Sequence, residues 1–249
     1  TSGIAGHGLL SRWVLREADG QIDALLALAT AHTTDAAVAA ARGLPGPPLN
    51  LVVGGRDGHI AHAVVGRYPL RRGDGWDGRV PAPWTGPAAW AGYVPAEKMP
   101  LSLDPAAGYV VSANDPGIAA VPPARNQQRL AGDFEPVFRA ARIAARLAAL
   151  SRATPQDLMA LQTDARSGMA PLAAEALSAC GLTSAPAAML RGWDGEMRGT
   201  GAPLLHAVFW SALSSRVTAH TRLGRIGDRF FAAPYRLKGL LRAARDDVW

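Results

Sequence analysis

The 249-residue chain consists of two portions that differ in the spacing of their apolar residues. Up to about residue 123, short apolar runs alternate with glycines and prolines, which is typical of strands and turns. From about residue 133 the apolar positions recur at helical spacing, and a polar stretch at 124–132 joins the two portions. We therefore expect an α+β fold with a strand-and-loop portion at 1–123 and a helical portion at 133–249, both belonging to one larger, truncated domain.

The clearest local signal is a β-hairpin. Apolar runs at 49–54 and 59–65 flank an Arg-Asp-Gly turn, and Asp-Gly readily takes the positive φ angles of a tight turn. Thr154 and Asp157 bracket Pro155 in the pattern that starts a helix, because the Thr154 hydroxyl can accept from the Asp157 amide. The other predicted elements are strands at 9–15 and 109–113, a loop-rich segment at 81–105, and helices at 22–30, 34–42, 137–150, 154–166, 169–180, 185–191, 202–219 and 235–245.

Composition narrows the classes of function. Arg, Asp, Pro or Gly interrupts every apolar stretch before the roughly 18 residues that a membrane-spanning helix needs, so we expect no membrane partner. Cys180 is the only cysteine, which excludes an internal disulfide and a thiolate metal cluster. The formal charge of +6 comes almost wholly from scattered arginines, densest at 216–245. Phosphate or nucleic-acid binding there is an alternative, but no zinc-finger or RNA-binding signature accompanies it and we expect no nucleic-acid partner.

Common catalytic signatures are missing from the sequence. It contains no GxSxG nucleophile elbow, no GxxxxGK[ST] phosphate loop, no HExxH and no acidic calcium loop. His59 and His62 lie three residues apart, and in a strand this spacing directs the two side chains to opposite faces. One metal ion could not bind both, so we interpret them as surface or core histidines.

Several segments in series carry a more specific signal. Residues 50–53 and 57–60 are similar to a strand and turn usually read Asn-Trp-x-x-Ala-Asp-x-Asp-Gly-Asn-Ile-Gly, with Leu51 and Gly55 in place of Trp and Asp. Residues 104–115 match Asn-Pro-x-x-Gly-(Tyr/Trp)-x-x-x-x-Asn, the most specific block, apart from Asp104 in the first position. Five further blocks follow the same order, at 66–71 (Gly-Arg-x-Pro-x-Arg), 84–95 (tryptophan-rich), 139–143 (arginine-bearing), 154–164 and 191–195 (Arg-Gly-Trp-Asp-Gly).

Taken together, these blocks cover about residues 9–198 and resemble the penicillin acylase family of N-terminal nucleophile (Ntn) hydrolases. The resemblance implies an interior part of the family's β-subunit, within an αββα four-layer sandwich carrying an appended helical region. Members hydrolyse linear amides with an amino-terminal serine whose own α-amine, with a pKa of about 7.7 to 8.0, is the base. Antibiotic biosynthesis is one setting for such an acylase.

Two residues inherit roles from this resemblance. Asn114 stands where the family asparagine donates its side-chain amide to the oxyanion, and Arg139 matches the arginine that supports the nucleophile's amino group. The residues themselves leave other interpretations open. Asn114 can simply cap a strand end in an Asn-Asp-Pro turn, and Arg139 can belong to a solvated stripe with Arg142 and Arg146.

The nucleophile is the main departure from the family pattern. Thr1 is chemically competent, but residues 1–6 lack the family's Ser-Asn start, so we expect the attacking serine outside this chain and no activity from the chain alone. The partners implied are an acyl amide substrate and the upstream β-segment and α-subunit of the same precursor. Acyl preference stays open among β-lactam side chains, acyl-homoserine lactones and lipopeptide tails.

Cofactor, compartment and activity are less constrained. The family's calcium has no recognisable ligands here, so we assign no cofactor and no metal residues, and a periplasmic or extracellular location rests on exported relatives alone. A free-standing enzyme with Thr1 as nucleophile is one alternative. A non-catalytic relic or binding module on the same scaffold is another, motivated by the changed residues Leu51 and Gly55 and by the absence of the serine.

Overall fold

A computed structural model describes residues 10–17, 20–71, 90–117 and 137–220. The chain divides into two compact units, Thr1–Ala149 and Leu150–Trp249, which are described separately below. The predicted boundary at 124–132 and the predicted helix at 235–245 lie outside the described residues, and the boundary stays a prediction.

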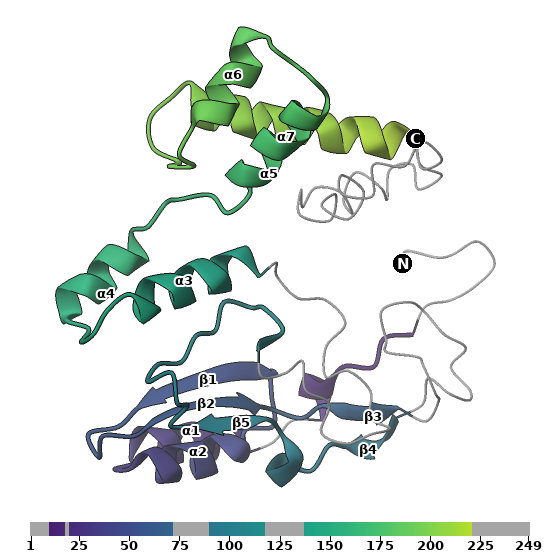
Figure 1. Ribbon diagram of the computed structural model, residues 1–249. Helices are drawn as coiled ribbons and strands as arrows, with labels where there is room; N and C mark the ends of the chain where they lie inside the picture. The colour runs from purple at the N-terminus through teal and green to yellow at the C-terminus, as the bar shows by residue number, and fades with distance from the viewer. Residues whose placement is uncertain (1–9, 18–19, 72–89, 118–136, 221–249) are drawn as a thin grey trace. The chain divides into compact units, whose positions relative to one another are not determined.

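The first unit is built on an antiparallel sheet with the strand order β1-β2-β5 (Figure 1). Its strands are β1 (Leu49–Gly54), β2 (Ile60–Val65) and β5 (Leu101–Leu103). The predicted hairpin is confirmed, since β1 and β2 pair from Leu49 with Val65 to Gly54 with Ile60. A second, two-stranded sheet joins β3 (Pro69–Arg71) to β4 (Trp90–Tyr93).

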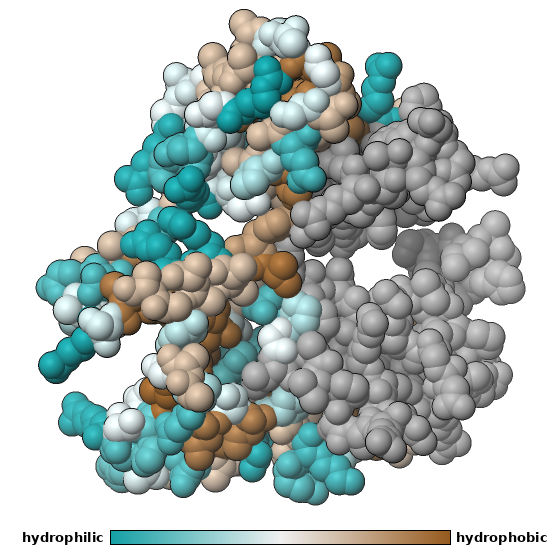
Figure 2. All heavy atoms as spheres, in the orientation of Figure 1, coloured by the Kyte–Doolittle hydropathy of each residue, from teal (hydrophilic) through white to brown (hydrophobic). Residues whose placement is uncertain are grey.

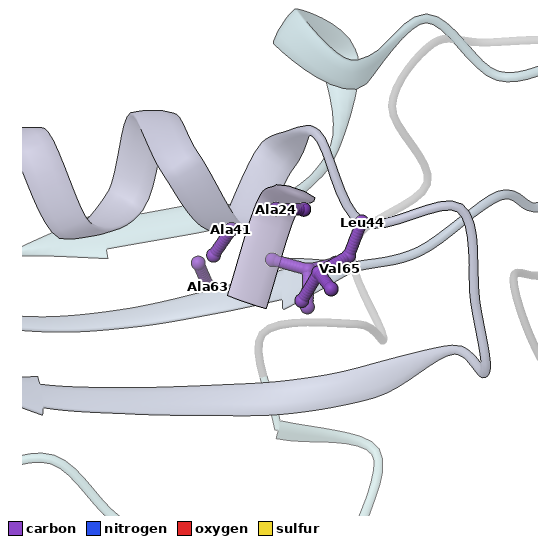
Figure 3. Packing of buried hydrophobic residues seen from close by; sticks show 5 residues of the cluster. All are labelled: Ala24, Ala41, Leu44, Ala63 and Val65. Atoms are coloured by element: carbon purple, nitrogen blue, oxygen red, sulfur yellow. The ribbon is translucent and has the colours of Figure 1, made fainter. Parts of the chain in front are cut away.

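Two helices, α1 (Gln21–Ala29) and α2 (Thr34–Arg42), cover one face of the three-stranded sheet (Figure 1). Small side chains at Ala24, Ala41 and Ala63 pack with Leu44 and Val65 in the core of this unit (Figure 3). Successive residues of a strand point to opposite faces. Ala63 and Val65 therefore face the helices. Val64 and His62, at the alternate positions of β2, face the opposite side of the sheet.

Asp57, in the hairpin turn, is bound to the first residue of α2. Its carboxylate accepts from the Thr34 backbone N–H at 2.7 Å and from the Thr34 hydroxyl at 2.9 Å, an arrangement named here the Thr34–Asp57 clasp. The backbone bond is the main reason that the pKa of Asp57 is lowered, and a negative charge at a helix N-terminus is favourable. A Cβ on Gly55 would lie 1.9 Å from Asp57 Oδ1 and 2.2 Å from Thr34 Oγ1, so glycine leaves room for the clasp.

The second unit is helical in its described part. It contains α4 (Pro155–Gln162), α5 (Ala170–Ala179), α6 (Ala185–Gly192) and α7 (Ala202–His220). The predicted start of α4 is confirmed as a capping box between Thr154 and Asp157. Its core joins three helices, α5 to α7, through Leu177, Ala187, Leu190, Leu205 and Phe209.

The helix α3 (Phe138–Ala148) belongs to the first unit and has no buried residue. Apolar and polar residues are interspersed on the visible face of the molecule (Figure 2). Among the described helices, none combines the length and the apolar character that crossing a membrane requires.

Two segments that were predicted as strands do not form strands. Residues 9–15 were expected to form a strand, but Val14–Arg16 forms a 3-10 helix, η1. Residues 109–113 form no ladder within the described chain. At the end of this segment the Ala113 N–H donates to Asp115 and the Ala113 carbonyl accepts from Arg139, so these two groups bond to side chains and not to a strand. That strand prediction is therefore wrong.

The loop-rich segment at 81–105 also contains more structure than expected. It holds β4 and β5, each only a few residues long, and a short 3-10 helix, η2 (Ala96–Lys98). Strands this short carry little local signal, and their partners β3 and β2 decide the pairing.

The clasp yields a prediction about the free energy of unfolding. Gly55→Ala should lower the free energy of unfolding by about 1 to 3 kcal/mol. The new Cβ displaces the Asp57 carboxylate from the N–H and the hydroxyl of the buried Thr34. Gly54→Ala is the matched control, since a Cβ there meets no atom within 4 Å, and should stay within about 0.5 kcal/mol. Urea denaturation measures both, and equal effects of the two substitutions would contradict the steric role of Gly55.

Candidate functional site

Asn114 lies in a turn that follows residues 109–113. Its φ angle is 60°, in the left-handed region, which asparagine tolerates better than most residues. The side chain is exposed, whereas the preceding Ala113 is buried. The turn thus anchors its backbone in the protein and presents the carboxamide at the surface of the first unit.

Arg139, at the start of α3, binds this turn. Its Nη2 donates to the Ala113 carbonyl at 2.6 Å and to Asn114 Oδ1 at 2.8 Å. Because a guanidinium only donates, the atom of Asn114 that faces it must be the oxygen. The Asn114 Nδ2 is thereby directed away from Arg139, and among the described residues it donates to no other group. The structure brings together the two site residues predicted from the sequence, although their catalytic roles stay predictions.

Asp115 closes the turn around Asn114. One carboxylate oxygen accepts from the Ala113 N–H at 3.1 Å, and the other accepts from the Gly117 N–H at 3.1 Å. The same side chain therefore bonds to the backbone on both sides of Asn114. This pair of bonds is named the Asp115 bridge.

His62 lies beneath the turn, on the sheet face opposite the helices. Its side chain is buried, and its Nε2 is 3.0 Å from Asn50 Oδ1 on the neighbouring strand. Since a carboxamide oxygen only accepts, Nε2 carries a hydrogen. Burial lowers the pKa of His62, and the nearby negative charge of Asp115 opposes that shift. The space that a Cβ on Gly117 would occupy lies 3.8 Å from His62 Cε1, so the imidazole borders the turn.

His59 and Asp104 form an exposed ion pair at the other end of the segment that leads to Asn114. His59 Nδ1 lies 2.6 Å from Asp104 Oδ2, and Asp104 Oδ1 accepts from the Ile60 N–H at 2.9 Å. The bond to Asp104 is the main reason that the pKa of His59 is raised. The bond from Ile60 is the main reason that the pKa of Asp104 is lowered, with His59 next. The pair joins the start of β2 to the residue that follows β5.

The predicted interpretation of the two histidines is confirmed, since His59 is exposed and His62 is buried with separate partners. No group of three or more potential metal-ligating side chains occurs in the part of the chain that is described, and calcium binding stays untested. An apolar groove of about 450 Å³ lies between α5, α6 and α7, wholly within the second unit. Its lining includes neither Asn114 nor Arg139. Thr1 lies outside the described residues.

The chemical capacity of this arrangement is that of a fixed neutral donor. A carboxamide whose oxygen is occupied keeps two N–H groups for an acceptor outside the turn. Held donors of this kind stabilise negative charge that develops on a carbonyl oxygen during acyl transfer. The mutual geometry of Asn114 and Arg139 suits such a role better than capping a strand end, because the Asn114 side chain makes no bond to its own turn among the described residues.

Comparison with a solved structure identifies the fold. The chain matches a thermostable penicillin G acylase from Alcaligenes faecalis with a TM-score of 0.61 at 20% sequence identity, over 79% of this chain and 37% of that one. The fold is thus the mixed α and β architecture of an Ntn hydrolase, as the sequence predicted. The described residues supply a sheet with a helical layer on one of its faces.

Sequence comparison assigns the family. The penicillin amidase family pattern matches residues 3–249, and the chain belongs to that family. It is 36% identical to penicillin acylase 2 proenzyme from Pseudomonas sp. strain SE83 over 241 residues, which is 93% of this chain and 30% of that relative. It is 33% identical to the acyl-homoserine lactone acylase QuiP from Pseudomonas aeruginosa over 167 residues, or 64% of this chain and 18% of that relative. The chain therefore spans less than a third of the length of either.

Sequence reasoning missed two side chains around Asn114. Asp115 was interpreted only as part of an Asn-Asp-Pro turn, and His62 only as a core or surface histidine. An Asp after Asn commonly bonds to a backbone N–H two residues on, which could have indicated half of the Asp115 bridge. The contact between His62 and the turn joins residues far apart in the sequence, and no local pattern reports it.

The ion pair predicts how stability depends on pH. The raised pKa of His59 contributes stability that is complete below about pH 6.5 and is lost as pH rises through its folded-state pKa. The lowered pKa of Asp104 contributes stability above about pH 3.9, lost as pH falls through its folded-state pKa. Between these limits the pair should be most stabilising.

Urea midpoints measured from about pH 5 to about pH 9 test this dependence. Asp104→Asn should remove the part of the decrease in the urea midpoint that accompanies His59 deprotonation. His32→Asn, which replaces an exposed histidine outside the pair, should leave the curve parallel to that of the parent chain. An unchanged decline in the Asp104→Asn variant would mean that the pair does not couple stability to pH.

Proposed function

We propose that this chain supplies the oxyanion-stabilising part of an amidohydrolase that cleaves linear acyl amides through an acyl-enzyme. In this proposal the chain corresponds to an interior part of a β-subunit. The attacking serine comes from polypeptide other than these 249 residues, as do the partner segments of the precursor. The chain alone is then inactive.

The observation that carries this proposal is the orientation of one carboxamide. Arg139 occupies Asn114 Oδ1, and the Asp115 bridge fixes the backbone on both sides, so Nδ2 is the end available to a substrate. A donor that is oriented before the substrate binds needs no reorganisation when charge develops. Membership of the penicillin amidase family gives the acceptor a chemical identity, the carbonyl oxygen of a scissile amide.

The reaction follows from this placement. A serine hydroxyl attacks the amide carbonyl while the serine's α-amine takes the hydroxyl proton, and the carbonyl oxygen becomes negatively charged. Asn114 Nδ2 donates to that oxygen. The tetrahedral species collapses as the amine leaves with the proton, which gives an acyl-enzyme. Water then attacks the ester through a second tetrahedral species stabilised by the same donor, and the acid is released.

Arg139 has two roles in this scheme. It orients the carboxamide through Oδ1, and it places a positive charge at the turn. If the serine's α-amine lies nearby, this charge favours the neutral, basic form of the amine by repulsion. The first role rests on a bond in this structure, and the second depends on where the nucleophile binds.

The proposed class of substrate is based on the names of the relatives. One curated relative is named a penicillin acylase and others are named acyl-homoserine lactone acylases, and both names denote removal of an acyl group from an amine. We therefore propose a small acyl amide as the substrate. The alternative of a non-catalytic relic keeps the absent serine as its motive but loses support from the two changed residues, because Leu51 packs against the sheet core and Gly55 makes room for the clasp.

A chimeric proenzyme tests the proposed function. The chain replaces the matching 241 residues of the strain SE83 penicillin acylase 2 proenzyme, and hydrolysis of chromogenic acyl amides is measured. The chimera should be active and the isolated chain inactive. Asn114→Ala in the chimera should lower kcat by about 100- to 1,000-fold, because one oxyanion donor is lost.

Gln156→Ala provides the control, because it removes an exposed carboxamide from α4 in the second unit and should leave kcat unchanged. Activity of the isolated chain would refute an external nucleophile. A processed, active chimera that tolerates Asn114→Ala would refute the oxyanion role.

A further inference from the structure

We propose that Asp115 and His62 are positioning residues for Asn114, which hold the turn in the conformation that presents the carboxamide for catalysis. This inference rests on the oxyanion role proposed above. It assigns a task to two side chains that touch neither the proposed substrate nor the reacting atoms, and that act through the backbone of the turn.

The need for such support follows from the backbone angle of Asn114. A left-handed residue other than glycine is conformationally unfavourable and persists when its surroundings hold it. Arg139 binds the Ala113 carbonyl and the Asn114 oxygen, but it leaves the backbone after Asn114 unrestrained. A second set of contacts must therefore close the turn on its far side.

Asp115 provides those contacts. Its carboxylate accepts from Ala113 N–H before Asn114 and from Gly117 N–H after it, so the backbone cannot rotate at position 114 without breaking a bond. Gly117 itself has a φ of 40°, a conformation that favours glycine. Two left-handed residues three positions apart are thus linked through one side chain.

His62 supports the bridge from below. It is only 5% exposed and is fixed to β1 by its bond to Asn50, so the ring is a rigid part of the sheet. Its Cε1 lies within contact distance of the space next to Gly117. The ring therefore lies next to the turn, whose Asn114 and Gly117 are themselves exposed. The charged group that faces the ring is Asp115, on the turn, while β1 contributes the neutral Asn50.

The test uses the ¹⁵N-labelled 249-residue chain and needs no catalysis. Backbone order parameters at residues 113–117 should be near about 0.85 in the parent chain and should fall below about 0.6 in Asp115→Ala. Asp115→Asn keeps one acceptor oxygen and should give an intermediate loss. His62→Ala should loosen the same residues, and His62→Phe, which refills the space under the turn with a ring, should restore most of the order.

Asp194→Ala is the matched control. Asp194 Oδ1 accepts from the Glu196 N–H at 2.9 Å in a similar turn of the second unit, so its loss should not change residues 113–117. Unchanged resonances of α1 and α2, which pack on the other face of the sheet, report that each variant is folded. Folded Asp115→Ala or Asp115→Asn with Asn114 as ordered as in the parent overturns the role of Asp115. Failure of His62→Phe to restore what His62→Ala loses overturns the role of His62 as a support.

The active chimera adds a kinetic readout. Positioning predicts that Asp115→Ala lowers kcat and leaves KM nearly unchanged, because only the transition-state oxyanion needs the donor fixed. A rise in KM at constant kcat overturns positioning. If the order parameters fall as expected while the parent chimera has no activity, the positioning of Asn114 stands and the proposed function fails.

Discussion

One guanidinium nitrogen determines what the candidate site can do. Arg139 Nη2 holds both the Ala113 carbonyl and Asn114 Oδ1, so a bond from a helix selects which end of a carboxamide faces outward. Without it, Asn114 could present either its oxygen or its nitrogen, and an oxygen would repel a developing oxyanion. In the proposed function, the sheet, the turn and α3 serve as the frame that holds this one donor toward the carbonyl oxygen of the substrate.

Much of the fold could be predicted because its signals are local. The Asp-Gly turn predicted the hairpin, and Thr154 with Asp157 predicted the start of α4, since each pattern carries its own geometry. The segments that were mispredicted depend on distant partners. β5 pairs with β2 across about forty residues of sequence, and the backbone of Ala113 bonds to side chains from a turn and a helix instead of to a strand.

The site could be predicted only as far as the family resemblance extended. Asn114 and Arg139 were found because they occupy matching positions in ordered blocks, and the structure brings them into contact. Asp115 and His62 were not assigned to the site, because their importance lies in contacts with the backbone and with β1. A sequence pattern records which residues recur, whereas support of a backbone angle depends on three-dimensional neighbours.

The clasp also constrains how this chain could have diverged from its relatives. The family pattern has an acid where Gly55 stands, and a side chain at that position would occupy the space taken by Asp57 and the Thr34 hydroxyl. The family acid and the clasp are therefore mutually exclusive in this geometry. Any side chain at position 55 would require Asp57 or Thr34 to move, so a chain that restores the family acid there must hold the start of α2 in another way.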